Sequence, residues 1–136
     1  MKNRKPDKDD YETPKELLNN LEIEFGKMFD PCPLHSKFDG LVIDWKEINF
    51  VNPPYSRKLK ELFIKKAYEE WRKGKTVIML LPVSTSTKIF HEYIYGFAEI
   101  RFIKGRIKFS GLKTSGQMDN MLVIYKPNKL YGTRLR

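Results

Sequence analysis

The tetrapeptide Asn52-Pro53-Pro54-Tyr55 follows a short apolar run and has the residue types that chemistry on a flat amino group needs. The two prolines fix φ and remove backbone donors, so the turn is stiff. The Asn52 amide oxygen and the Pro53 carbonyl can each accept one N–H bond of a planar amino group, and the Tyr55 ring offers a stacking face. A proline-stiffened loop with a surface tyrosine is the alternative, but chance gives this tetrapeptide only about once in a few thousand such chains. We therefore interpret residues 52–55 as a catalytic turn.

Helix and strand patterns alternate along the chain, and they predict the elements that must position this turn. Thr13 suits the N-cap of a helix in which Pro14 takes the first helical position, and Gly26 marks its end. A second, amphipathic helix is expected over 57–73, and Ser84 to Thr87 supply caps for a third that runs through Tyr95. Strands are expected at 28–30, 41–44, 48–51, 76–81, 99–103 and 121–125, the last two as antiparallel neighbours.

This order predicts an α/β fold with a mainly parallel sheet and helices on both faces. Ligands of such sheets bind beyond the carboxyl ends of the strands. The expected strand ends carry Asp30, Asp44, Asn52 and Pro82. We therefore expect these residues to lie together at one site.

The length of 136 residues predicts one domain, 11–136, preceded by a flexible polar arm, 1–10. The net charge of +9 is uneven, because residues 100–136 hold nine Lys/Arg and one acid, Asp119. Aromatic residues are mixed with these cations. A solvated basic face is the alternative, but the asymmetry favours a phosphate-bearing partner, and we expect this basic part to contact nucleic acid.

Cysteine and histidine are too few for an internal disulfide or a recognisable metal site. Cys32 is the only cysteine, which fits a reducing cytoplasm. Cys32, His35 and His91 match no metal-ligand spacing, so no metal is expected. No apolar run approaches the roughly 20 residues of a membrane span, and the polar N-terminus is not a signal peptide. We expect a cytoplasmic protein without membrane contact.

From about residue 10 to 126, the order of short motifs resembles the phage-type DNA N6-adenine methyltransferase family, whose members use S-adenosylmethionine. The motifs that carry the resemblance are Glu12-Thr13-Pro14, Phe29-Asp30-Pro31-Cys32, Asp39-Gly40-Leu41, Asp44-Trp45, Asn52-Pro53-Pro54-Tyr55-Ser56, Leu80-Leu81-Pro82, Phe90-His91-Glu92-Tyr93 and Ile103-Lys104-Gly105-Arg106. It implies a reduced Rossmann-like methyltransferase fold. The chain departs from larger methyltransferases because residues 30–33 replace a glycine-rich loop, and Ile43 comes only 13 positions after Asp30.

The resemblance also implies roles for individual residues. Asn52, Pro53, Pro54 and Tyr55 would act on the amino group of an adenine flipped out of double-stranded DNA in a bacterial host, with no metal involved. The S-adenosylmethionine site would be formed by Thr13, Pro14, Asp30, Pro31, Cys32 and Asp44. DNA would be contacted by Lys104, Arg106, Lys108, Phe109 and Lys113, with Phe109 either a second stacking face or part of the core.

The catalytic turn by itself leaves the acceptor open. Glutamine amides in proteins, bases in RNA and the N4 amino group of cytosine are also planar amino groups. A degenerate fold kept as a nucleic-acid-binding module is a further alternative. The basic C-terminal part favours DNA over a protein acceptor. Oligomeric state and target DNA sequence stay open.

Overall fold

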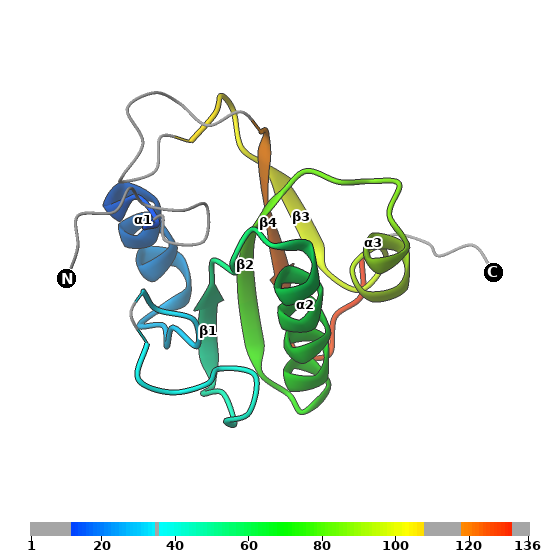
Figure 1. The fold of residues 1–136 in the computed structure, drawn as a ribbon. Coiled ribbons are helices and arrows are strands. Elements are labelled where there is room, and N and C mark those ends of the chain that lie inside the picture. Colours follow the sequence, from blue (N-terminus) through cyan, green and yellow to red (C-terminus); the bar gives the residue numbers. More distant parts are fainter. Residues whose placement is uncertain (1–11, 35, 108–117, 132–136) are drawn as a thin grey trace.

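The computed structural model describes residues 12–34, 36–107 and 118–131. Within these residues the chain forms one four-stranded sheet in the order β1-β2-β4-β3. Its strands are β1 (Ile48–Val51), β2 (Thr76–Pro82), β3 (Glu99–Phe102) and β4 (Asn120–Tyr125). The helices are α1 (Lys15–Phe25), α2 (Arg57–Arg72) and α3 (Lys88–Tyr93) (Figure 1).

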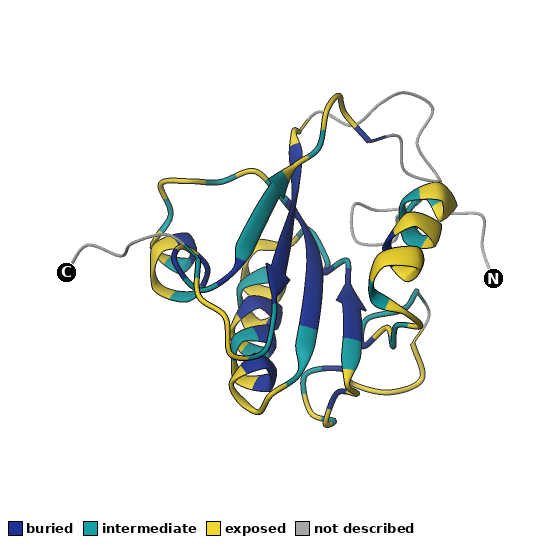
Figure 2. Ribbon diagram, turned by 180° about the vertical axis from the view of Figure 1, so that it is seen from behind, coloured by how far each residue is buried: buried dark blue, intermediate teal, exposed yellow. Residues whose placement is uncertain are grey.

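Helices contribute to the core on both faces of the sheet, as expected. Side chains alternate along each strand, so each strand supplies both faces. The face under α2 and α3 holds a cluster that includes Val51, Phe63, Ala67, Trp71, Val77, Met79, Leu81, Phe90, Val123 and Tyr125. The opposite face holds a second cluster, in which α1 takes part, with Leu21, Phe50, Ile78, Leu80, Leu122 and Ile124. The central strands β2 and β4 are therefore the most deeply buried (Figure 2).

The expectation of a mainly parallel sheet is wrong. β1 and β2 are parallel and are joined by α2, whereas β2–β4 and β3–β4 are antiparallel. Parallel neighbours need a crossover of a dozen or more residues, and β4 instead returns beside both β2 and β3 in the opposite direction. Below, the carboxyl edge is the end of the sheet to which β1 and β2 point, and the amino edge is the opposite end.

Residues 41–44 do not form the expected strand. The Asp39 carboxylate accepts from the Leu41 amide at 2.9 Å, and the Asp39 carbonyl accepts from the amides of Val42 and Ile43. These local bonds use the donors that a strand would need, which is the usual effect of an aspartate turn. The expected strand at 28–30 is reduced to one parallel bridge between Phe29 and Asn49.

The expected N-cap is present at α3 and absent at α1, and α2 has a cap that the sequence analysis did not name. Ser56 and Thr87 cap α2 and α3, because their hydroxyls accept from the amides of Leu59 and Phe90. Thr13 does not cap α1, which begins one residue later than expected, after Pro14. Pro14 has an extended ψ of 137°, which keeps Thr13 outside the helix and leaves its hydroxyl for another partner.

Candidate active site

The 52–55 turn leaves the carboxyl end of β1 and leads directly into α2. Asn52 is half-buried and Pro53 is buried. The Ser56 cap begins the helix immediately after Tyr55, so strand and helix hold the turn at both ends. The Asn52 amide is therefore presented from a stiff support, as an electrostatic catalyst requires.

Thr13, which lies 39 positions before Asn52 in the sequence, makes a hydrogen bond to the catalytic turn. Its Oγ1 accepts a hydrogen bond of 3.0 Å from the Asn52 Nδ2. Both side chains are half-buried, and Pro14 follows at the start of α1. The contact joins the beginning of α1 to the end of β1 and leaves the Asn52 Oδ1 without a recorded partner in the described residues.

The Tyr55 ring packs against the core cluster on the α1 face of the sheet. Ile103 also packs there, and Ile107, which closes the described part of the basic segment after β3, belongs to that cluster. Tyr55 stays half-exposed. Tyr55 is thus supported by the protein, and it packs against the same cluster as the segment that was expected to contact DNA.

Asp30 follows the Phe29 bridge to β1 and so lies toward the carboxyl edge. Its Oδ1 accepts from the Cys32 amide at 2.8 Å. Desolvation at the carboxyl group raises the pKa of Asp30 above its usual range, and the Cys32 bond opposes this rise in pKa only in part. Asp30 is exposed as a whole residue, so the desolvation concerns its carboxyl group alone. Asp30 lines a hollow of about 240 Å³, whose other lining residues are Lys15, Leu18, Asn19, Glu22, Met28 and Phe50.

A second hollow, of about 440 Å³, opens beside Pro31 and Cys32. Its other lining residues are Ser36, Lys37, Phe38, Asp39, Gly40 and Phe63. The loop reaches this position only because residue 40 is glycine, since a Cβ there would lie 1.9 Å from the Pro31 carbonyl oxygen. The Trp45 indole then donates to the Gly40 carbonyl at 2.7 Å and fixes the loop.

Asp44 is not brought together with Asp30 and Asn52. Its side chain is 86% exposed and lies 3.6 Å from the ammonium of Lys73, just beyond the end of α2. Lys73 precedes β2, so this ion pair belongs to the amino edge. The separation follows from the aspartate turn at 39–43, which replaces the strand that would have carried Asp44 to the carboxyl edge.

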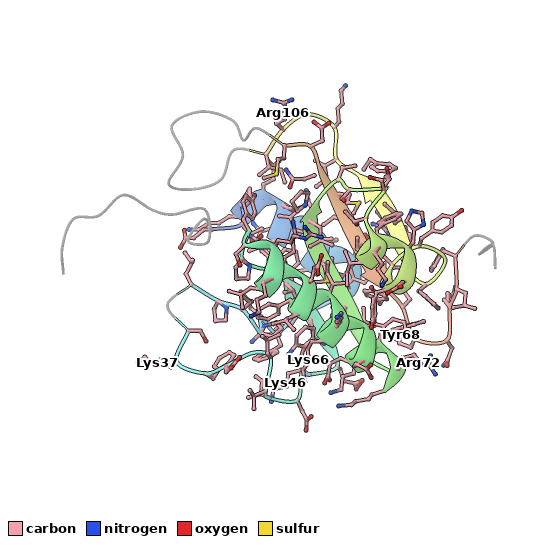
Figure 3. The ribbon with its side chains drawn as sticks, turned by 45° about the vertical axis from the view of Figure 1, so that its right-hand side comes forward. Lys37, Lys46, Lys66, Tyr68, Arg72 and Arg106 are labelled. Atoms are coloured by element: carbon pink, nitrogen blue, oxygen red, sulfur yellow. The ribbon has the colours of Figure 1, made fainter. Side chains whose placement is uncertain are left out.

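Lys104 and Arg106 are exposed in the segment that follows β3. Arg106 lies 3.5 Å from the carboxylate of Asp119. Figure 3 shows Arg106 at the end of the molecule to which β1 and β2 point, with Lys46 and Arg72 toward the other end. Lys108, Phe109 and Lys113, together with the 1–10 arm, lie outside the described residues.

Sequence reasoning did not single out Glu70, which lies near the end of α2. Its side chain is fully buried and accepts from Lys66, Lys73 and Lys75 and from the Trp45 amide. Burial by itself would raise the pKa of Glu70, but these hydrogen bonds outweigh it and hold the pKa at about 2. The helical period from Phe63 and Ala67 does place residue 70 on the inward face, so the signal was present.

Neither a metal cluster nor a membrane helix is found in the described ranges. No group of three or more His, Cys, Asp or Glu side chains there could hold a metal ion. No helix there is long and apolar enough to cross a membrane.

The half-buried Asn52 amide and the supported Tyr55 ring lie in one turn at the carboxyl edge of a mixed α/β sheet, an arrangement that suits an enzyme acting on a planar amino group. The chain belongs to the DNA N-6-adenine-methyltransferase (Dam) family, whose model matches residues 1–132. Because this match spans nearly the whole chain, the protein is an enzyme of this family.

Two phage proteins are similar to the chain. The DNA N-6-adenine-methyltransferase of Haemophilus phage HP1 is 31% identical over 96% of this chain and 86% of its own length. The DNA N-6-adenine-methyltransferase of Escherichia phage T1 is 32% identical over 71% of this chain and 45% of its own length. No solved structure matches the chain significantly.

Proposed function

We propose that this protein transfers a methyl group from S-adenosylmethionine to the N6 amino group of adenine in DNA, and that it is encoded by a phage or prophage. The family match and the two phage relatives support this activity. The observation that carries the proposal is the Asn52 amide, held by Thr13 at the carboxyl edge with Tyr55 in the same turn.

The adenine amino nitrogen is a weak nucleophile because its lone pair is delocalised into the ring. Asn52 Oδ1 and the Pro53 carbonyl oxygen would each accept one of its N–H bonds. This would favour a more pyramidal nitrogen and stabilise the positive charge that develops as the N–C bond forms and the bond between the methyl carbon and the donor sulfur breaks. The donor would leave as the neutral thioether S-adenosylhomocysteine, and the methylated nitrogen would release one proton to water. Orientation supplies much of the remaining acceleration, so no strong base is required.

The residues around Asp30 fit a cationic donor with a polar tail. S-adenosylmethionine supplies a methyl group on a positively charged sulfur, from which a nucleophile takes it by in-line displacement. Asp30 offers a desolvated carboxyl without a cationic partner in the described residues, and Thr13 and Pro14 lie at the same edge. Pro31 and Cys32 line the larger hollow, whose volume lies in the range of cofactor pockets.

Asp39, rather than Asp44, is the acid of that larger hollow. We infer that the shortened 30–45 segment forms the donor site of a reduced Rossmann-like fold, in which a loop replaces strands of larger methyltransferases. The earlier assignment of Asp44 to the donor then depends on a rearrangement of the 41–45 loop.

Double-stranded DNA would approach the carboxyl edge. Lys104 and Arg106 would contact phosphates there, with Lys108, Phe109 and Lys113 completing the basic segment outside the described residues. The adenine must leave the stack to reach Asn52, and Tyr55 would receive it by stacking. The reaction would take place in the cytoplasm of the bacterial host, as the phage relatives suggest.

Methyl transfer to a defined duplex tests the proposal. We expect the wild-type protein to place labelled methyl from S-adenosylmethionine on adenine, and Asn52→Ala to lower the rate by about 10² or more with an unchanged melting temperature. Digestion of the product separates N6-methyladenine from N4-methylcytosine. Label on cytosine would change the acceptor, and an Asn52→Ala variant with the wild-type rate would refute the mechanism.

A non-catalytic DNA-binding role would give a different result. In that case the protein would bind the duplex but calorimetry would detect no S-adenosylmethionine binding, with or without DNA.

A further inference from the structure

A third hollow, of about 320 Å³, lies between α2 and α3 at the carboxyl edge. Leu81 and Pro82, at the carboxyl end of β2, line it, as does Arg57, which begins α2 two residues after Tyr55. We propose that this hollow binds a nucleotide of the DNA other than the target adenine, with the phosphate at Arg57 and Lys60 and the sugar and base against the apolar floor. The inference rests on the proposed function and adds a second DNA-binding surface to it.

The hollow belongs to the opposite face of the sheet from Tyr55. Phe90 and Ile94, which line the hollow, are part of the core cluster under α2 and α3. Tyr55 packs against the cluster on the α1 face, as does Ile103, which precedes the basic segment. The hollow is therefore a separate subsite from the ring on which the target adenine would stack.

The lining of the hollow suits a nucleotide. Its polar lining residues are Arg57, Lys60, Glu61, Ser84 and Thr87. The remaining lining residues are apolar, with the Phe90 ring among them. A nucleotide has the same two properties, since its phosphate is charged and its sugar and base present apolar faces. The volume lies near the lower end of the range for small-ligand sites, about 300 Å³, which fits one nucleotide unit.

The first turn of α2 carries charges that oppose the helix dipole. The amino end of a helix has a partial positive charge, which favours acidic side chains there. In contrast, α2 begins with Arg57, Lys58 and Lys60 and has no acidic residue in its first turn. These cations disfavour the helix by themselves, and an anion bound beside them would remove the repulsion. The charge pattern therefore favours a phosphate as the charged part of the ligand.

A phosphate can reach both cations that line the hollow. Arg57 lies 3.4 Å from the carboxylate of Glu61, but the Arg57 side chain is 86% exposed. Exposed pairs of this kind contribute little to stability, so Arg57 can exchange Glu61 for a phosphate. Lys60 forms no ion pair with another described residue and lines the same hollow. The two cations also disfavour the positively charged sulfur of S-adenosylmethionine at this place.

The salt dependence of DNA binding, measured by fluorescence anisotropy with a labelled duplex, tests the two cations. Arg57→Gln combined with Lys60→Gln should reduce the log–log salt slope by about one if both bind one phosphate and by about two if they bind neighbouring phosphates. Lys65→Gln combined with Arg72→Gln removes the same charge from later turns of α2 and should leave the slope nearly unchanged. An unchanged slope in the first double variant, or equal losses in both, would overturn the inference.

Ser84 allows a test of the hollow that leaves the charge unchanged. Its hydroxyl donates to Thr87 Oγ1 at 3.3 Å. Ser84→Phe fills the hollow and should weaken duplex binding about tenfold, with the dissociation constant for S-adenosylmethionine within about twofold of wild type. Ser84→Ala loses the same hydrogen bond but leaves the hollow open, so it should bind DNA as wild type does.

A folded Ser84→Phe variant with wild-type DNA affinity, or with a loss confined to S-adenosylmethionine, would overturn the inference. Melting temperatures show whether each variant is folded, and if Ser84→Phe is not, the two charge variants decide the matter. Both tests measure DNA binding, so they remain decisive if the wild-type protein binds the duplex but transfers no methyl, a result that would refute the proposed function alone. A wild-type protein that binds no DNA would refute both.

Discussion

At the amino edge of the β1–β2 pair the buried carboxylate of Glu70 is paired with lysines, whereas at the carboxyl edge the half-buried Asn52 and the exposed Asp30 each make one side-chain hydrogen bond within the described residues. Glu70 binds three lysines and the Trp45 amide. Asn52 is held by Thr13 through its nitrogen, and Asp30 by the Cys32 amide. The Glu70 carboxylate is fully hydrogen-bonded within the protein, whereas Asn52 and Asp30 retain oxygen atoms that could accept hydrogen bonds from a ligand.

The difference indicates that the two edges have separate tasks. A buried ion cluster stabilises the fold only while every charge keeps its partners. A preorganised acceptor at a strand end costs some desolvation and becomes useful when the substrate donates to it. The burial of Glu70 is thus a structural feature, whereas desolvation raises the pKa of the Asp30 carboxyl, which no cation of the described residues offsets.

Loss of Glu70 should have the largest effect on stability. Glu70→Ala leaves Lys66 and Lys75 without their buried partner, and we expect the free energy of unfolding to fall by about 3 kcal/mol, measured by urea denaturation. The pKa of Glu70 is lowered to about 2, so its contribution is full above about pH 4.5 and is lost as pH falls toward 2. An advantage of wild type over Glu70→Gln that persists undiminished at pH 2 would contradict the cluster's role.

Tyr55 should affect binding of the base. Tyr55→Ala should weaken affinity for a duplex with an unpaired target adenine by about 1 to 2 kcal/mol, because stacking is lost. Fluorescence of a 2-aminopurine at the target position measures extrusion directly. Tyr55→Phe keeps the ring face and serves as the control. A Tyr55→Phe variant as weak as Tyr55→Ala would mean that the hydroxyl, and not the ring, binds the DNA.

Asp30 should lower the stability of the fold and raise the affinity for S-adenosylmethionine. The pKa of Asp30 is raised, so the charged form destabilises the fold once pH rises above the folded pKa, and Asp30→Asn should be as stable as wild type or more stable at pH 7. We expect its dissociation constant for S-adenosylmethionine to rise about tenfold in calorimetry.

Asp44→Asn is the matched control for Asp30, since Asp44 is an exposed acid of the amino edge. We expect it to change donor affinity by less than about twofold. A loss at Asp44 equal to that at Asp30 would restore the sequence-based assignment of Asp44 to the donor site and would require the 41–45 loop to move.

The smallest effect is expected from the surface cations. Replacing Lys104 and Arg106 by glutamine should weaken DNA binding and reduce the log–log salt slope by about two if both contact phosphates. Replacing Lys46 and Arg72 removes the same charge near the opposite end of the molecule and should leave the slope nearly unchanged (Figure 3). The reverse result would place DNA on the amino edge.

The sequence by itself located most of the local elements and predicted the catalytic turn. Apolar runs located β1, β2, β3 and β4 within one residue, and Thr87, one of the expected cap residues, caps α3. The two prolines and the Asn52 amide predict the chemistry of the 52–55 turn without knowledge of their tertiary contacts, because backbone stiffness and hydrogen-bonding capacity are properties of the residues themselves.

Only the tertiary structure decided which distant residues share an edge. A strand and an aspartate turn compete for the same amides, and the turn at Asp39 placed Asp44 far from Asn52. Thr13 satisfied the pattern of a helix cap, yet its hydroxyl found the Asn52 amide. Glu70 lies on the inward face of α2 with three lysines close to it in sequence, but only the tertiary structure brings the Trp45 amide to its carboxylate. Such partners are set by packing across long stretches of chain, and local pattern does not encode them.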